Sequence, residues 1–425
     1  MSKVLIISSD GHAASPLPDY RPYLEQRYQE DLDELVAAQN LRTTINFFDV
    51  LDPDVAVPYK EAMYDSGVID GRFDVERRLR EVEADGIIGE VLFPDGAPFG
   101  AGGLGSARTR FPRELELAGG HAYNRWLADF VEPHPERFAA QAIISLLDVD
   151  QAVADVHWAA NHGFKGLVMP GMDDDLPMFW SSVYEPFWSA CEETGLCLNF
   201  HGGIGQPTYG GAQLEGVPSN VRMRVSVFEF PFFAHRPLWF LIWSGVLERH
   251  PGLQIVFTEQ HSDWVLQVIA QLDHSWHNGT MERSIRSIVP HPPSHYFRRQ
   301  VHLGSSVLAR GEVLNHQQIG SGTMMFGADF PHPEGTWGKT LPYLQATVGA
   351  SDMSDDEVTA FLGGNAAALF GFDTTALQPV VDAHGWSLDE IRQPIEEAGR
   401  TKLLRSDAFR PTVALQTTVE IQEHR

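Results

Sequence analysis

The sequence predicts an α/β protein in which eight parallel strands, joined by helices, close into a (β/α)8 barrel. Two observations support this prediction. Short apolar runs that resemble strands alternate with helical patterns over most of the 425 residues, and this alternation is typical of a parallel sheet covered by helices. Acidic and imidazole side chains directly follow several of these runs, as expected where the carboxyl ends of barrel strands form a common mouth.

Each expected strand is a short apolar run that follows a helical pattern or a loop. The runs are VLIISS from Val4, GIIGEVLFPD from Gly86, RFAAQAIISLLD from Arg137, GFKGLVMPG from Gly163, LCLNFHGG from Leu196, LQIVFTEQH from Leu253, RRQVHLGSS from Arg298 and TMMFGADFPH from Thr323. The last helical pattern, SDDEVTAFLGGNAAALFGF, begins with a capping box formed by Ser354 and Glu357 and supplies the eighth helix.

Two segments fall outside this repeat. Residues 16–70 are too many for an ordinary βα loop, which usually takes about 2–6 residues, and an insertion after the first strand is expected to cover the mouth as a lid. Residues 374–425 contain one more helix, capped by Ser387 with Glu390, and are expected to pack on the outside of the barrel or on a partner subunit. The predicted domains are a barrel over residues 1–373 and a C-terminal extension over residues 374–425.

The chain is strongly acidic, with a formal net charge of −26 and a pI near 5.0. Nucleic acids and anionic membranes bind basic faces, so we expect neither as a partner. The acidity also disfavours an anionic substrate unless arginines gather locally. We therefore expect the protein to act on a small molecule.

Cysteine usage and the apolar segments indicate the compartment. Cys191 and Cys197 are too few for a disulfide framework and lack zinc-site spacing, which favours buried free thiols in a reducing cytoplasm. The N-terminal apolar stretch is too short for a signal peptide. The longest apolar segment, FEFPFFAHRPLWFLIWSGVL from Phe228, is interrupted by charges and prolines, whereas a membrane span needs about 20 nearly uncharged residues. It predicts a buried helix or a subunit contact in a cytoplasmic homo-oligomer.

Candidate metal ligands follow four of the expected strands. Asp10 and His12 stand two residues apart, so on a strand both side chains point to the same side. His201 ends its strand before two glycines, which let backbone and ligands approach closely. Glu259 and His261 repeat the spacing of two on the sixth strand. Asp329 ends the eighth strand, where a carboxylate either binds a metal or activates a metal-bound water.

The number of candidate ligands leaves the number of metals open. His332, three residues after Asp329, is a ligand, a proton shuttle or a loop-ordering group. Without cysteine in the set, a closed structural zinc site is disfavoured, and histidine with carboxylate suits a catalytic Zn²⁺, Mn²⁺ or Fe²⁺. Four ligands and one base serve a single metal, but these positions offer seven candidates, which is enough for two.

Other side chains are candidates for substrate binding. Arg108 and Arg110, after a glycine-rich loop, form either a clamp for a phosphate or carboxylate or the solvated start of a helix. Arg236 lies among aromatic residues, as an anchor or as a side chain that reaches back to solvent. Trp337 either forms a wall of the pocket or simply packs beside a strand end.

The motifs SSDGHA, GFKGLVMPG, LNFHGG, IWSGVLERHPGLQIVFTE, PPSHYFRR, FGADFPHPEGTW and GGNAAALFGFD, taken together, resemble the amidohydrolase-2 group of the amidohydrolase superfamily. This resemblance implies a TIM barrel with a divalent metal at its C-terminal mouth. Well-known relatives catalyse hydrolysis or non-oxidative decarboxylation with His-x-His or Glu-x-His on the first strand. This chain differs, because it has Asp10-Gly11-His12 there and Glu259-Gln260-His261 where those relatives have a histidine followed by glycines.

The SDGHA and DYRPYLE segments more closely resemble the TIM-barrel non-heme diiron monooxygenases typified by the hydroxylase of platensimycin and platencin biosynthesis. This branch acts largely on coenzyme-A-linked substrates. The first hypothesis is therefore an O2-dependent hydroxylase with two irons, an apolar or acyl-CoA substrate, and Glu259 as a ligand or proton carrier. The runner-up is a hydrolase or non-oxidative decarboxylase with one Zn or Mn, in which His12, His201 and Asp329 hold the metal and His261 is the general base.

Overall fold

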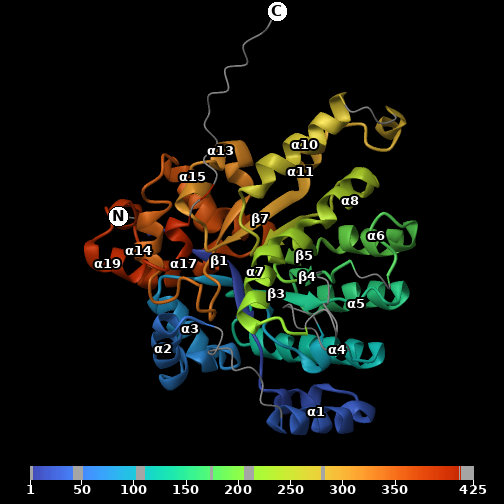
Figure 1. The fold of residues 1–425 in the computed structure, drawn as a ribbon, viewed down its shortest axis with the longest axis horizontal. Coiled ribbons are helices and arrows are strands. Elements are labelled where there is room, and N and C mark those ends of the chain that lie inside the picture. Colours follow the sequence, from blue (N-terminus) through green and yellow to red (C-terminus); the bar gives the residue numbers. More distant parts are fainter. Residues whose placement is uncertain are drawn as a thin grey trace, which may run out of the picture.

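The computed structural model describes residues 3–41, 51–101, 111–172, 176–204, 215–278, 283–410 and 412. Eight parallel strands form one sheet in the order β1 to β8 (Figure 1). They are β1 (Ile7–Ala13), β2 (Gly89–Pro94), β3 (Phe138–Ile143), β4 (Gly166–Val168), β5 (Cys197–His201), β6 (Ile255–Thr258), β7 (Val301–Ser306) and β8 (Met324–Gly327).

The segment after β8 closes the sheet against β1. The N–H of Asp329 donates to the carbonyl of Asp10 at 2.9 Å, and the N–H of His12 donates to the carbonyl of Phe330 at 2.8 Å. The predicted (β/α)8 barrel is therefore confirmed. Closure also brings the loop after β8 against the part of β1 that carries Asp10 and His12, so residues more than 300 positions apart share one end of the barrel.

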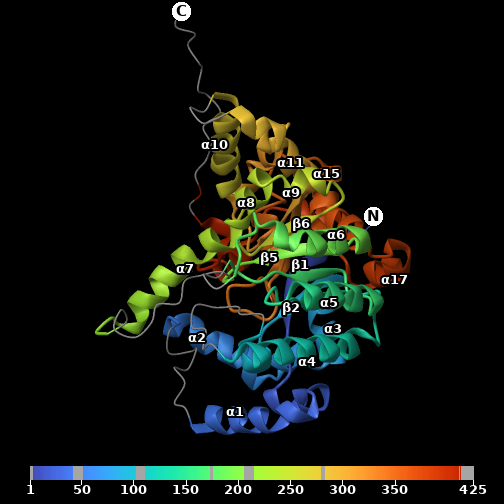
Figure 2. The same cartoon turned by 90° about the vertical axis from the view of Figure 1, so that its right-hand side faces the viewer.

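Helices surround the barrel and connect its strands (Figure 2). After β1 to β4 come α3 (Val75–Ala84), α4 (Arg113–Val131), α5 (Val149–Asn161) and α6 (Glu185–Thr194). After β5 come α7 (Ser219–His235), α8 (Pro237–Trp243) and α9 (Val246–Arg249), and after β6 come α10 (Trp264–Asn278) and α11 (Pro293–Gln300). After β7 and β8 come α12 (Arg310–Val313), α13 (His316–Ile319), α14 (Thr340–Ala346), α15 (Asp355–Thr359) and α16 (Asn365–Phe370).

Local sequence explains why these helices form and which side they bury. In α5, the side chain of Asp148 caps the first turn by accepting the N–H of Gln151 at 3.1 Å. The buried residues Ala152, Val156 and Ala159 of this helix follow the spacing of one helical face. The capping box of Ser354 with Glu357 is present at the start of α15, as predicted. Cys191 and Cys197 are free and buried, also as predicted.

The insertion after β1 and the C-terminal extension both reach the mouth. The insertion contains α1 (Gln29–Leu41) and α2 (Pro53–Tyr59), and the Tyr59 hydroxyl donates to the carbonyl of Pro331 in the loop after β8 at 2.7 Å. The extension contains α17 (Thr374–His384), α18 (Leu388–Arg392) and α19 (Glu397–Lys402). The division of the chain into a barrel, a lid-like insertion and an extension stays a prediction.

The end of the extension contacts mouth loops rather than only the outside of the barrel. Arg405 pairs with Asp52 of the insertion at 3.0 Å, and Arg410 pairs with the buried Glu312 of α12.

Among the helices of the described residues, none combines the length and apolarity needed to cross a membrane.

One buried carboxyl group makes the stability of the fold depend on pH. Asp85, next to the end of α3, accepts hydrogen bonds from the N–H of Gly338 at 3.0 Å and the hydroxyl of Thr340 at 2.5 Å. Burial raises the pKa of Asp85 from 3.8 to about 7. The folded chain thus binds this proton more tightly than the unfolded chain does. Stability therefore falls as the pH rises from about 4 to about 7.

Asp85→Asn keeps the acceptor and removes the charge. We expect it to raise the free energy of unfolding at pH 8 by at most about 4 kcal/mol, which is about 3 pKa units at about 1.4 kcal/mol each, and to change little at pH 4. Chemical denaturation at the two pH values measures this difference. An equal gain at both values would contradict the assignment.

Candidate metal centre

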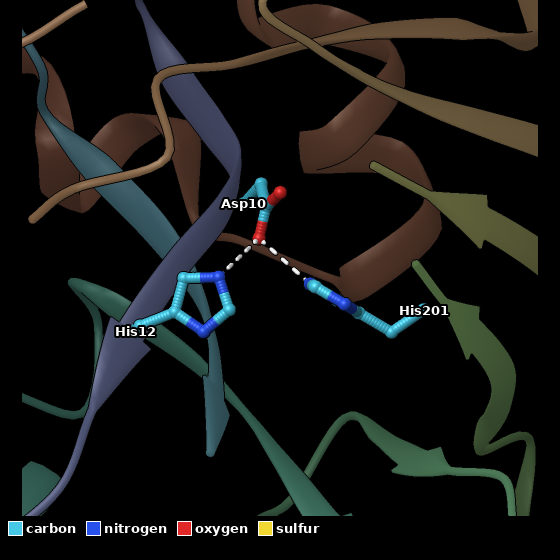
Figure 3. Close-up of side chains that lie close together, drawn as sticks. All are labelled: Asp10, His12 and His201. Carbon is cyan, nitrogen blue, oxygen red and sulfur yellow. Dashed lines mark hydrogen bonds and ion pairs between the residues drawn. The ribbon is translucent and has the colours of Figure 1, made fainter. Parts of the chain in front are cut away.

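Three candidate ligands from β1 and β5 converge at the mouth. Asp10 and His12 lie near the end of β1, and His201 is the last residue of β5. Asp10 Oδ1 lies 3.4 Å from His12 Nε2 and 3.2 Å from His201 Nε2 (Figure 3). All three side chains are buried, and the hydroxyl of Ser306 donates to the other oxygen of Asp10. The carboxylate of Asp10 is therefore held between the two imidazoles.

Asp329 and His332 bring the loop after β8 to the same place. Asp329 Oδ1 lies 3.2 Å from His12 Nε2 and 2.9 Å from His332 Nδ1. The His332 ring stacks on that of His12 with 4.1 Å between ring centroids, and its Nε2 lies 3.3 Å from Asp95 Oδ1. His332 is thus placed between two carboxylates beside the ligand group. This position is compatible with binding a metal, carrying a proton or ordering the loop.

The loop after β6 separates Glu259 from His261. The expectation that both side chains point to one side of a strand is wrong, because β6 ends at Thr258. The backbone of Glu259 and of His261 is left-handed, with φ of 57° and 59°, so the chain turns between them. Glu259 Oε2 reaches to 3.3 Å from His201 Nδ1. Burial lowers the pKa of the His261 side chain to about 4. The indole N–H of Trp264 donates to the backbone carbonyl of His261 at 3.2 Å.

Ligand atoms lie within 4.8 Å of one another in three groups of the described residues: Asp10, His12 and His201; His12, Asp329 and His332; and Glu259, Asp329, His332 and Glu334. His261 belongs to none of these groups. Imidazole nitrogens and carboxylate oxygens are the donors that Zn²⁺, Mn²⁺ and Fe²⁺ accept.

The hydrogen bonding of these groups also fits a cation. Asp329 is fully buried, yet among the described residues its carboxylate oxygens and His12 Nε2 make ion-pair contacts but no well-aligned hydrogen bonds. Buried polar atoms are normally paired by hydrogen bonds. Side chains that approach one another closely in this way, with poorly aligned hydrogen bonds, are arranged as metal ligands are. The residues present therefore fit a divalent cation.

Burial and neighbouring charges determine which ionisable side chains at the barrel mouth carry protons. Burial lowers the pKa of His12, but the carboxylates of Asp10 and Asp329 outweigh this effect and raise it to about 9. The pKa of Asp10 is lowered, because His201 and His12 outweigh the effect of burial. Burial raises the pKa of Glu259 well above its usual range, and the charges of Asp329 and Asp10 add to this. Ligands must lose their protons to bind a metal, so metal binding here releases protons.

A buried ion pair that the sequence pattern does not indicate supports the ligands. Arg78 of α3 binds Glu90 of β2 through Nε to Oε2 at 2.6 Å and Nη2 to Oε1 at 2.8 Å, and its Nη1 donates to the carbonyl of His12 at 2.7 Å. A Cβ at Gly11 would lie 2.8 Å from both Arg78 Nη2 and Glu90 Oε1. Glycine between the two β1 ligands therefore permits this close approach, and the pair fixes the backbone of His12.

Asp95 and Glu334 were also missed. Asp95 follows the apolar run of β2 directly, which is the same signal that identified the ligands after the other strands. Its pKa is lowered, because His332 outweighs the effect of burial. Glu334 lies in the loop after β8, where only the folded chain brings it beside Glu259.

Of the candidate substrate-binding residues, Arg236 and Trp337 lie in the described part of the chain. Arg108 and Arg110 fall outside the described residues. Arg236, at the end of α7, places its guanidinium carbon 5.2 Å from the ring centroid of Phe240 in α8. Trp337 is half-buried and packs on Phe330, the residue after Asp329, with 6.4 Å between centroids. Trp337 is therefore nearer to the ligands along the chain than Arg236 is.

Solved structures show the same fold. The chain is similar to a 5-carboxyvanillate decarboxylase from Sphingomonas paucimobilis, with a TM-score of 0.57 and 18% identity over 87% of this chain and 100% of that chain. An amidohydrolase from Mycobacterium avium subsp. paratuberculosis gives a TM-score of 0.61 and 18% identity over 87% and 99% of the two chains. A dihydroxybenzoic acid decarboxylase from a Polaromonas species, solved with manganese and 2-nitroresorcinol, gives 0.56 and 18% over 87% and 97%. At this identity the likeness concerns the fold alone.

A search of curated proteins found no match. A family model described as amidohydrolase matches residues 73–372, which is well over half of the chain. The matched range contains β2 to β8 and, with them, His201, Glu259 and Asp329. The motifs that suggested the resemblance and the barrel that carries the ligands agree with this match, and the chain belongs to the amidohydrolase family.

Proposed function

We propose that the protein is a mononuclear, divalent-metal-dependent enzyme that decarboxylates a small aromatic acid without oxidation. The observation that carries this proposal is the convergence of Asp10, His12 and His201 at one point, with Asp329 beside them. A site of histidine and carboxylate ligands, without cysteine, is typical of catalytic metals with open positions. A bound metal supplies Lewis-acid stabilisation of negative charge on the substrate. The decarboxylases of like fold, one of them solved with manganese, are the reason for choosing this substrate class and metal.

The chemistry requires a proton donor beside the metal site. When a carboxylate leaves an aromatic ring as CO2, the ring carbon must take up one proton in its place. Glu259 is placed to hold that proton, because its carboxyl group lies 3.3 Å from His201 and its side chain is only 15% exposed. His332 is a second acid, and its Nδ1 lies 2.9 Å from Asp329 Oδ1. The proposed roles are ligands for Asp10, His12, His201 and Asp329, and general acid for Glu259.

Glu259→Gln tests the assignment of the proton donor. We expect it to lower kcat by about 10²- to 10⁴-fold, the usual contribution of a general acid, while the metal stays bound. His261→Ala is the matched control in the same loop, because His261 lies in none of the ligand groups. It should keep the metal and lose less activity than Glu259→Gln.

The assay measures CO2 release from 5-carboxyvanillate and 2,6-dihydroxybenzoate with Mn²⁺ present, and metal content by elemental analysis. Loss of the metal in Glu259→Gln would make Glu259 a ligand rather than the acid. Absence of CO2 release, together with hydrolysis of an ester or amide, would replace decarboxylation by the hydrolase alternative.

The third ligand group favours a second candidate function. Glu259, Asp329, His332 and Glu334 bring four ligand atoms together and share Asp329 and His332 with the second group, so the mouth offers donors for two cations. We therefore keep a non-heme diiron hydroxylase that acts on an apolar or coenzyme-A-linked substrate with O2 and an external two-electron donor. It predicts about two irons per chain and oxygen uptake with substrate. A single manganese or zinc without oxygen uptake would exclude it.

A further inference from the structure

Helix α7 has no polar side. In NVRMRVSV, residues 220–227, polar and apolar residues alternate with a period of two instead of the 3.6 of an amphipathic helix, and the apolar Phe228 follows directly. In a helix, residues two apart point about 200° away from each other. Apolar side chains therefore lie around the whole helix. A helix of this kind is normally enclosed by protein on all sides.

Within the described part of the single chain, α7 is not enclosed on all sides. It projects away from the barrel in Figure 2, and large apolar side chains are exposed along it, above all Val227 (62%), Phe228 (86%) and Phe232 (53%). Val221, Met223 and Val225 are exposed as well. The next helix differs, because Leu238, Leu241 and Ile242 of α8 are buried within the chain. The apolar segment from Phe228 is thus both a buried helix, in α8, and an unpartnered surface, in α7.

The exposed apolar side chains of α7 are concentrated on one element. All six lie within the twelve residues from Val221 to Phe232. Contiguous apolar patches of more than a few hundred Å² are uncommon on monomers and mark interaction sites.

We propose that α7 is a self-association surface, on which two copies of this chain pair through antiparallel α7 helices about a two-fold axis near Ser226 and Val227. The charges of the helix favour this occupant. Arg222 and Arg224 lie in its first half and Glu229 lies in its second half, so an antiparallel pair places each arginine end beside the partner's glutamate end. With a net charge of −26, two copies repel through most other faces, whereas α7 carries more arginine than glutamate. Ser226 is small enough to let the two helices approach at the crossing.

Charged substitutions on α7 test the pairing. We expect the full-length protein to have twice the 47.3 kDa chain mass by light scattering at micromolar concentration. The double variant Val225→Glu/Phe228→Glu should have the mass of one chain, with an unchanged circular dichroism spectrum because both positions are exposed. Leu404→Glu is the control, since Leu404 is 71% exposed but lies outside α7, and this variant should stay a dimer. A monomeric wild type, or a dimer that survives the double substitution, would overturn the proposal.

Cross-linking tests the orientation of the pair. Both native cysteines are buried, so a short bismaleimide should join chains only through an introduced cysteine. Val227→Cys should give a covalent dimer, because residue 227 faces its own copy across the axis. Val221→Cys should give little, because antiparallel pairing separates the two copies of residue 221 by about eleven helical steps of about 1.5 Å. Equal cross-linking at both positions would indicate parallel helices and contradict the model of the pair. Binding of a monomeric wild type to neutral phosphatidylcholine vesicles would assign α7 to a lipid surface instead.

Discussion

Asp329→Asn is expected to release the metal and to lower kcat by about 10³-fold or more. Asparagine keeps the volume of the side chain and tolerates the left-handed backbone at this position, where φ is 56°. The variant should therefore fold. It loses the negative charge that lies 3.2 Å from His12 Nε2 and 2.9 Å from His332 Nδ1. The large effect follows because Asp329 is shared by two of the three ligand groups.

Metal content and thermal stability both report this loss. A ligand that binds only the folded state raises its stability, so added Mn²⁺ should raise the Tm of the wild type and leave that of Asp329→Asn unchanged. Asp356→Ala is the control, since Asp356 is an exposed carboxylate of α15 that belongs to none of the ligand groups. Full metal content and full turnover in Asp329→Asn would place the metal elsewhere.

Arg78→Leu is expected to cost about 3–5 kcal/mol of folding free energy, the usual effect of removing one partner of a buried ion pair. Arg78 and Glu90 are both buried, and Glu90 would keep its charge without its partner. The carbonyl of His12 would also lose its donor. We therefore expect metal affinity to fall by about 10- to 100-fold, as it does when groups that orient a ligand are removed.

Two further variants separate the causes of this effect. The double variant Arg78→Leu/Glu90→Leu removes both charges and should recover most of the lost stability, but it should not recover the metal affinity. Arg77→Leu breaks the partly exposed pair of Arg77 with Glu81 at 2.9 Å and should cost less than about 1 kcal/mol. Chemical denaturation and metal titration measure the two quantities. A loss in Arg78→Leu no greater than that in Arg77→Leu would mean that the pair adds nothing to the fold.

The sequence predicted those parts of the site that depend on strand ends. Asp10, His12, His201 and Asp329 each stand at or just after an apolar run, and in a parallel barrel all such positions meet at one mouth. The loop after β6 could not be predicted in this way. The spacing of Glu259 and His261 suggested a strand, whereas their left-handed backbone depends on contacts made by Gly304, Phe200 and Glu312, which are far apart in sequence.

Other groups were missed for a different reason. Arg78 and Glu90 look like ordinary surface residues of a helix and a strand, since the sequence does not show that both turn inward beneath Gly11. The apolar run from Phe228 predicts one helix, whereas the structure divides it between α7 and α8. The polar–apolar alternation of α7 precedes this run and begins near Val221. Periodicity identified the elements, and it did not reveal which of their faces would be covered.

The contact of Arg410 with Glu312 has a consequence for the time at which the mouth is completed during synthesis. Glu312 is fully buried and accepts the N–H of Ser262 at 2.6 Å and the N–H of Ala309 at 2.8 Å, while Arg410 supplies its positive charge. A ribosome releases β8 well before Arg410, and domains fold as they emerge. Before Arg410 is available, Glu312 is either buried without a counter-charge or exposed to water. The loop that carries Glu259 is then held less firmly, because Ser262 of this loop donates its N–H to Glu312. A nascent chain can thus close its barrel first and complete its mouth only after residue 410 has left the ribosome.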